Sequence, residues 1–318
     1  MYNGILQIFP REIRPLFEKI LLGEKCLNEI RLRAERPIII LAGEREEFIT
    51  EQGMVTEHIA YARCLRGEEL EKILQHLCHY SLYAYEEEIK QGYLTISGGH
   101  RVGMVGQVVS EDPGKVRTMK YICGINIRIA HEIKGAAGAV LPFLYENGKP
   151  KSVLIISPPG CGKTTLLRDV VRSFSDGNIY GKGVNVGVVD ERSEIAGCYM
   201  GQPQNDVGIR TDVLDACPKM VGMRMLLRSM SPKVIAIDEL GDEKELEMVH
   251  QIAASGSKVV VTMHGEGIED LKKRKWLDKV VEERLFEIVL VLKKEGSRCT
   301  VKQIHEITEG GKIKCKES

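Results

Sequence analysis

The chain has 318 residues, which is enough for two domains that each bury a hydrophobic core. Its 45 basic and 45 acidic side chains give a formal net charge of zero, which argues against a protein whose whole surface binds a polyanion. No apolar stretch approaches the ~18 residues of a membrane span, so we expect any role at a membrane to depend on a partner protein.

The part of the chain up to about Glu132 mixes helical patterns with strand-like runs. Amphipathic patterns predict helices over Pro10–Leu22 and Gly67–Tyr83. Asn28–Arg33 alternates polar and apolar residues and is followed by Pro37–Leu41, which together predict a hairpin. Three further strand-like runs complete a small predicted sheet: Tyr93–Ile96, Arg101–Val109 and Gly124–Ile129. Residues 1–133 are therefore expected to form a smaller α+β domain.

From residue 134 to residue 318 the pattern changes to strands that alternate with helices. After a short helix expected at Leu141–Tyr145, the predicted strands are Val153–Ile156, Val184–Val189, Val234–Ile237 and Val259–Thr262, and the predicted helices are Thr164–Phe174, Val213–Met230 and Glu243–Ala254. Phe286–Lys293 and Cys299–Ile304 are expected to pair about the turn Glu295-Gly296. This order indicates an α/β domain with a mainly parallel twisted sheet and helices on both faces. Ligands of such sheets bind at the carboxyl ends of the strands.

A glycine-rich turn links the first of these strands to the helical pattern after it. Its residues are Ser157, Pro158, Pro159, Gly160, Cys161, Gly162, Lys163, Thr164 and Thr165. Such a turn is typical of a phosphate-binding loop, in which backbone N–H groups and a helix N-terminus bind phosphate oxygens. Lys163 is expected to reach the β- and γ-phosphates, and Thr164 to bind Mg²⁺. The alternative is a chance Gly-Lys-Thr in a surface turn, against which the flanking strand and helix argue.

Ser157 and Cys161 are unusual residues for such a loop. Ser157 stands where the first glycine of the pattern normally occurs, and we expect Pro158 and Pro159 to hold the turn by fixing φ. Cys161 lies beside Lys163 and near a helix N-terminus, a setting that lowers the pKa of a thiol, so alkylation at Cys161 is expected to abolish nucleotide binding. The alternative is an inert small residue that fills the loop. Nine cysteines without a Cys-x-x-Cys pair favour a reducing, cytoplasmic compartment.

Acidic residues follow two of the predicted strands. Asp238, after Val234–Ile237, is expected to hold Mg²⁺, and Glu239 to polarise the attacking water, which favours a hydrolase over a small-molecule kinase. The alternative is a strand that ends in solvated acids. Asp190 and Glu191 end another strand and are expected to face the same crevice, unless the cluster is structural and pairs with its own arginine.

A third strand ends in Thr262, Met263 and His264. A lone histidine at a strand end is often structural, whereas here its place beside the expected γ-phosphate also favours a sensing role. Both interpretations stay open at this point.

Along the chain, the phosphate-binding loop is followed by the acidic cluster Asp190–Glu194, by the strand that ends in Asp238 and Glu239, and by the histidine segment Thr262–Gly265. These four elements in this order resemble the secretion-type ATPases, which are the traffic ATPases of type II and type IV secretion and of type IV pilus machines. That resemblance implies a RecA-like P-loop ATPase domain and a ring of six subunits at the cytoplasmic face of a membrane channel. It also implies that Glu239, Asp190 and Glu191 serve hydrolysis of ATP. Arg101 and Arg128 of the N-terminal domain match best the positions from which the family's arginines reach the nucleotide.

Within this family the sequence is most similar to a sporulation branch found in endospore-forming bacteria. The residues that carry this likeness are Asn28–Arg33, Gly98–Gly103, Asn126–Ala130 and Val189–Ile195. The likeness implies partners in a membrane channel that joins mother cell and forespore, and a position on the mother-cell side.

The sequence also departs from the family pattern. Asp238 stands where many secretion ATPases carry glycine, and Gly241 where many carry arginine.

The sequence leaves two alternatives to a secretion motor open. The first is a RecA-like ATPase that depends on nucleic acid, which zero net charge and few aromatic residues disfavour, so no nucleic acid is expected. The second is a scaffold gated by ATP with little turnover.

Overall fold

The computed structural model describes residues 3–23, 27–112, 115–273, 278–295 and 298–316. The chain divides into two compact units. The first comprises the chain up to His131 together with Gly197–Gln204, and the second comprises Glu132–Ala196 and the chain from Asn205 onward. Among the described residues, none of the helices is both long and apolar enough to cross a bilayer.

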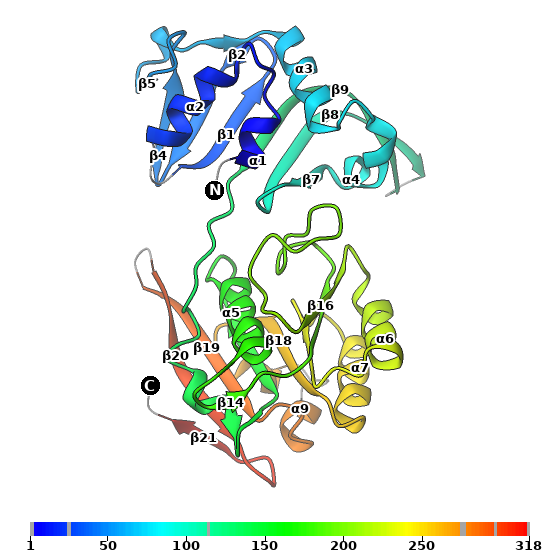
Figure 1. Cartoon of the computed structure of the whole chain (residues 1–318). Helices are drawn as coiled ribbons and strands as arrows, with labels where there is room; N and C mark the ends of the chain where they lie inside the picture. Colours follow the sequence, from blue (N-terminus) through cyan, green and yellow to red (C-terminus); the bar gives the residue numbers. More distant parts are fainter. Residues whose placement is uncertain (1–2, 24–26, 113–114, 274–277, 296–297, 317–318) are drawn as a thin grey trace. The chain divides into compact units, whose positions relative to one another are not determined.

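The first unit is built on an antiparallel sheet with the order β5-β4-β3-β1-β9-β8-β7 (Figure 1). Its strands are β1 (Leu27–Arg33), β3 (Ile39–Ala42), β4 (Arg45–Ile49), β5 (Val55–Thr56), β7 (Tyr93–Ile96), β8 (His100–Asp112) and β9 (Lys115–Arg128), and β2 (Arg36–Pro37) pairs separately with β6 (Cys64–Leu65). The helices are α1 (Asn3–Gln7), α2 (Arg14–Gly23), α3 (Gly67–Leu77) and α4 (Glu86–Gln91), with 3₁₀ turns η1 (Ile59–Tyr61) and η2 (Leu82–Tyr85). Apolar residues of these helices and of the sheet share one core.

The predicted hairpin of this unit is confirmed, because β1 pairs with β3 and places Ile30 opposite Ile40. Two helix predictions were wrong at one end. The helix expected from Pro10 begins at Arg14, and the helix expected to reach Tyr83 ends at Leu77. His79 and Tyr80 adopt left-handed backbone angles, φ 46° and 61°, which a continuing α-helix does not allow.

The second unit contains an eight-stranded sheet with the order β16-β15-β17-β18-β12-β19-β20-β21. Its strands are β12 (Val153–Ser157), β15 (Val186–Asp190), β16 (Thr211–Asp215), β17 (Val234–Ile237), β18 (Lys258–His264), β19 (Ile288–Glu295), β20 (Arg298–Ile307) and β21 (Ile313–Lys316). Neighbours from β16 to β19 run parallel, and β20 and β21 are added antiparallel. The shorter elements are η3 (Leu141–Phe143), the pair β10 (Tyr145–Glu146) and β11 (Lys149–Pro150), and the pair β13 (Gly177–Asn178) and β14 (Gly181–Lys182).

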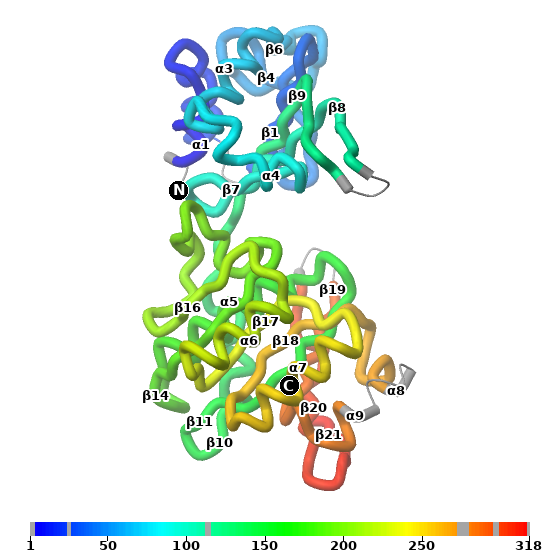
Figure 2. Tube along the Cα trace, turned by 90° about the vertical axis from the view of Figure 1, so that its right-hand side faces the viewer, coloured from blue at the N-terminus to red at the C-terminus, as the bar shows by residue number. Residues whose placement is uncertain are grey.

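Helices cover both faces of this sheet, as predicted. The helices are α5 (Lys163–Asp176), α6 (Lys219–Ser229), α7 (Glu243–Ala254), α8 (Asp270–Lys273) and α9 (Asp278–Glu282). α6 and α7 lie side by side (Figures 1 and 2) and share one core with alternate residues of the central strands. α5 packs against β12, β15 and β18 through residues that are not part of that core, and so lies on the opposite face. Every residue of β12, β15 and β17 is buried, which explains their continuous apolar runs.

Three predictions for this unit need correction or completion. The helix expected over Val213–Met230 is wrong at its start, because Thr211–Asp215 forms the strand β16 and the helix begins only at Lys219. β16 is a five-residue, half-exposed edge strand, so its short pattern lacks an apolar run. The helix expected at Leu141–Tyr145 is a single 3₁₀ turn. β19 and β20 pair as predicted, while Gly296 of the predicted turn lies outside the described residues.

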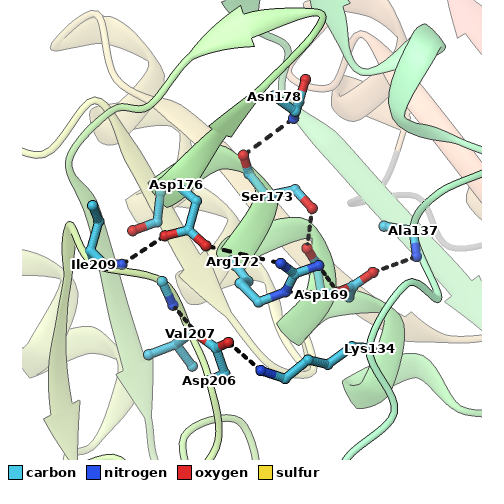
Figure 3. A network of polar contacts seen from close by, with 12 residues as sticks. Lys134, Ala137, Asp169, Arg172, Ser173, Asp176, Asn178, Asp206, Val207 and Ile209 are labelled. Atoms are coloured by element: carbon cyan, nitrogen blue, oxygen red, sulfur yellow. Dashed lines mark hydrogen bonds and ion pairs between the residues drawn. The ribbon is translucent and has the colours of Figure 1, made fainter.

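A polar network on α5 holds two incoming segments of the second unit (Figure 3). Asp169 is buried, accepts a hydrogen bond from Ala137 N at 2.8 Å and is paired with Arg172 at 2.7 Å. Asp176, two turns of helix after Asp169, accepts a hydrogen bond from Ile209 N at 2.9 Å. The network therefore fixes the chain around residue 137 and the loop that precedes β16 to the same helix.

We expect Asp169→Ala to lower the free energy of unfolding by about 1–3 kcal/mol, because it leaves the buried Ala137 N–H and one side of Arg172 without an acceptor. Urea denaturation monitored by circular dichroism measures this change. Asp176→Ala is the matched control, since its carboxylate is one-third exposed and water can replace it. Equal losses in the two variants would contradict the role given to Asp169.

Candidate functional site

The glycine-rich loop connects β12 to α5, as its sequence predicted. Its backbone is left-handed at Gly160 (φ 69°) and Gly162 (φ 74°), the conformation that glycine adopts without strain. Ser157 is buried, has no positive φ, and its hydroxyl donates to Pro158 O at 2.9 Å. Position 157 therefore does not require glycine, which accounts for the departure seen in the sequence.

Around this loop, residues from several strand ends line a cavity of about 350 Å³. The lining consists of Pro159, Gly160, Cys161, Gly162, Lys163, Thr164, Thr165, Arg192, Glu194, Asp238, Glu239 and His264. The structure thus brings most of the predicted loop residues together with the predicted acids Asp238 and Glu239 and with His264.

Asp238 connects the loop helix to the neighbouring strands. Its Oδ2 accepts a hydrogen bond from Thr164 Oγ1 at 2.9 Å, and its Oδ1 is hydrogen-bonded to Thr262 Oγ1. The hydroxyl of Thr164 and the carboxylate of Asp238 are oxygen ligands of the kind that Mg²⁺ prefers. Because they already lie in contact, the pair fits a magnesium ion bound beside the loop.

Lys163 and His264 form a second connection across the cavity. Lys163 Nζ lies 2.8 Å from His264 Nδ1, and His264 Nε2 lies 3.0 Å from Glu239 Oε1. Lys163 Nζ also lies 3.0 Å from His264 Nε2, so the imidazole lies between the ammonium group and the Glu239 carboxylate. Burial lowers the pKa of Lys163, and the carboxylates of Asp238 and Glu239 act in the opposite direction. The loop thus carries a desolvated cation that faces the space where an anion would bind.

Glu239 has an unusual backbone for a non-glycine residue. Its φ is 59°, in the left-handed region, which costs of order 1–3 kcal/mol. Its N–H donates to Thr262 Oγ1 at 2.9 Å, and its carbonyl accepts from Lys219 Nζ at 2.6 Å. Lys219 is held in turn by Glu245 at 2.8 Å, a carboxylate that also accepts from Gly241 N at 2.7 Å. These contacts hold the side chain of Glu239 over the cavity.

The second acidic cluster divides into a structural and an exposed residue. Asp190 is buried, and its carboxylate accepts backbone N–H bonds from Glu194 (2.8 Å), Ile195 (3.0 Å) and Ala196 (2.8 Å). Burial raises the pKa of Asp190, and those three hydrogen bonds act against the shift. Glu191 is exposed and lies 3.9 Å from Lys219. Asp190 therefore shapes the loop that follows β15, while Glu191 lines a neighbouring pocket together with Lys219 and Glu239.

Cys161 differs from the sequence prediction. It is buried, and burial raises the pKa of its thiol instead of lowering it, with a further contribution from a hydrogen bond to Cys299. The charge of Lys294 lowers the pKa of this thiol but does not outweigh the desolvation. Both cysteines line a second, mainly apolar cavity of about 650 Å³ on the β20 side of the loop, together with Thr165 and Leu166.

The two predicted arginines belong to the first unit. Arg101 of β8 lies opposite Arg128 of β9 in the antiparallel register, and the guanidinium of Arg101 lies 4.0 Å from the ring centre of Tyr93. The structure places both arginines within the first unit only, so their contact with a nucleotide stays a prediction.

Sequence reasoning missed two cations that organise the site. Lys219 is the first residue of α6. Had Thr211–Asp215 been predicted as a strand, Lys219 would have been expected shortly after the carboxyl end of that strand, at the edge where the site lies. Arg168 of α5 donates to Ile195 O at 2.5 Å and Glu194 O at 2.7 Å, which ties the acidic loop to the loop helix. No sequence signal distinguishes Arg168 from an ordinary helix residue.

Comparisons with known proteins identify the family of this chain. The family described as sporulation stage III, protein AA, matches residues 2–312. Over 305 residues the chain is 40% identical to the stage III sporulation protein AA of Bacillus subtilis (strain 168), covering 96% of this chain and 95% of that protein.

Solved structures share the fold at low identity. The ATPase DotB of Legionella pneumophila matches with a TM-score of 0.60 at 14% identity, over 95% of this chain and 82% of that one. The pilus retraction motor PilT, solved with bound ADP, matches with a TM-score of 0.61 at 15% identity, over the same shares. The chain therefore belongs to the stage III sporulation protein AA family and has the fold of the secretion ATPases.

Proposed function

We propose that this protein binds ATP with Mg²⁺ at the loop of residues 157–165 and hydrolyses it. The observation that carries this proposal is the meeting of Lys163, Thr164, Asp238 and Glu239 around one cavity at the carboxyl ends of parallel strands. A desolvated ammonium, a hydroxyl–carboxylate pair and a second carboxylate are the groups that phosphoryl transfer to water requires.

Each residue then has a distinct task. Lys163 and the backbone N–H groups of the loop bind the phosphates, and Thr164 and Asp238 hold Mg²⁺, which neutralises charge on the phosphate oxygens when bound. Glu239 accepts a hydrogen bond from the attacking water and orients it. His264 contacts both Lys163 and Glu239. When the Lys163 ammonium group binds phosphate, its contact with His264 is expected to change, and His264 would pass that change to Glu239. Arg101 and Arg128 are proposed to stabilise charge on the transferring phosphate.

We propose that the protein acts in sporulation as a ring that powers or gates a membrane channel complex between mother cell and forespore. Membership in the sporulation family supports the process, and the fold shared with DotB and PilT supports a traffic-ATPase role. A hexamer on the mother-cell side, with membrane channel proteins as partners, is the assembly that we propose on this basis.

We expect Lys163→Ala to abolish binding of Mg-ATP, and Glu239→Gln to leave binding intact but slow hydrolysis by about 10²–10⁴-fold through loss of the water-orienting carboxylate. Calorimetry measures binding, and a single-turnover assay with radiolabelled ATP measures hydrolysis. Lys182→Ala, an exposed lysine on β14 of the same unit, is the control for Lys163. Loss of binding in Glu239→Gln would contradict the separate roles. A wild type that binds but does not turn over would instead identify an ATP-gated scaffold.

Lys219→Gln is expected to reduce kcat roughly 10- to 100-fold with little change in KM, because the hydrogen bond that it removes from the Glu239 carbonyl is worth about 1.5–3 kcal/mol. Lys219→Arg should recover part of the rate. Lys244→Gln, on an exposed position of α7, should behave as wild type. An increase in KM at constant kcat would show that Lys219 serves binding and not the position of Glu239.

The proposed ring predicts that the mass in solution rises to six subunits when ATP and Mg²⁺ are added, measured by light scattering coupled to size exclusion. Lys163→Ala should not respond, since it cannot bind the nucleotide. A wild type that remains a monomer at every nucleotide concentration would contradict the ring and leave the ATPase proposal to the assays above.

A further inference from the structure

Two cysteine thiols from distant parts of the sequence meet at the phosphate-binding loop. Cys161 lies within the loop, and Cys299 lies in β20, opposite Lys294 of β19. Cys299 Sγ lies 3.8 Å from the carbonyl oxygen of Gly160, the residue before Cys161, and both cysteines line the same cavity. A Cβ built on Gly162 would lie 3.7 Å from the Cβ of Cys299. The beginning of β20 therefore packs directly against the loop.

The two thiols differ in access to solvent. Cys161 is 1% exposed, whereas Cys299 is exposed at the surface. A soluble oxidant can therefore reach Cys299 first, and Cys161 directly follows the residue whose carbonyl Cys299 Sγ contacts. An exposed thiol with a second thiol beside it is the arrangement found where disulfides form reversibly.

We propose that Cys161 and Cys299 form a reversible disulfide that fastens the phosphate-binding loop to β20 and closes the site to nucleotide. The effect on nucleotide rests on the proposed function, whereas the disulfide itself does not.

The reaction needs a disulfide of low molecular weight as oxidant. The Cys299 thiolate attacks one sulfur of that disulfide, forms a mixed disulfide and releases the first small thiolate. Cys161 then loses its proton and attacks the Cys299 sulfur, which forms the Cys161–Cys299 bond and releases the second small thiolate. Two electrons pass from the protein to the small disulfide, and the two protons end on the released thiols. Excess small thiol reverses both steps.

The position of the bond explains why it would exclude nucleotide. Cys161 and Cys299 both line the apolar cavity on the β20 side of the loop, where a nucleoside attached to loop-bound phosphates would extend. A disulfide would place both sulfurs in the shared wall and stop the loop from moving relative to β20. Gly160 and Gly162, which give the loop its left-handed turns, lie on either side of the bonded residue.

The test uses the full chain treated with oxidised glutathione or with dithiothreitol. Peptide mass mapping without reduction should identify a Cys161–Cys299 cross-link, and bound Mg-ATP should slow its formation. Calorimetry with Mg-ATP should show the number of binding sites per chain fall to roughly one-tenth, at unchanged Kd, when about nine-tenths of the chain is oxidised, because only the reduced fraction is competent. Dithiothreitol should restore the number of sites.

Cys299→Ser keeps the loop sequence intact and should bind Mg-ATP equally with and without oxidant. Cys315→Ser, which removes an exposed thiol from β21 of the same sheet, should respond as wild type does. Absence of the Cys161–Cys299 peptide after oxidation would overturn the proposed site, and a cross-linked protein that binds as many nucleotides per chain as the reduced protein would overturn its effect on nucleotide. If reduced wild type binds no nucleotide, the proposed function fails, while the peptide map still decides whether the disulfide forms.

Discussion

The arrangement of the site depends on the relative lengths of three parallel strands. β12 and β18 run in register up to Ser157 opposite His264, whereas β17 pairs with β18 only up to Ile237 opposite Val261. β18 therefore extends past the end of β17. Thr262 of this extension is hydrogen-bonded to the Asp238 carboxylate, and Thr164 donates to the same carboxylate from the loop helix. A change of register between these strands would separate the ammonium, the hydroxyls and the acids, since adjacent residues of a strand point to opposite faces.

Much of this arrangement follows from the sequence because the central strands are buried on both faces. Continuous apolar runs locate β12, β17 and β18, and the residues after each run then fall at one edge of the sheet. The edge strand β16 has no such run, so Val213–Asp215 were assigned to the helical pattern that follows, and the position of Lys219 at the start of α6 was missed. A local sequence pattern identifies strands that are buried in the centre of a sheet, and it is less reliable for strands at the edge.

Residue type alone also does not tell how an acidic side chain is used. Asp190 and Glu239 both follow buried strands, yet Asp190 turns inward to three backbone N–H groups and Glu239 turns toward the cavity. The difference arises from the backbone, because Glu239 alone of the two has a left-handed φ, held by Thr262 and Lys219. Those partners come from separate elements, so the conformation of Glu239 depends on tertiary contacts that no short window of sequence contains.

The buried serine at position 157 has a practical consequence for how relatives are found. Only the two later glycines of the loop carry the positive φ that a side chain would strain, and the serine occupies an ordinary backbone conformation. A search pattern that demands glycine at the first position would pass over this chain, although the two left-handed turns of its loop are intact. A pattern written from backbone requirements, with glycine demanded only where φ is positive, would retain it.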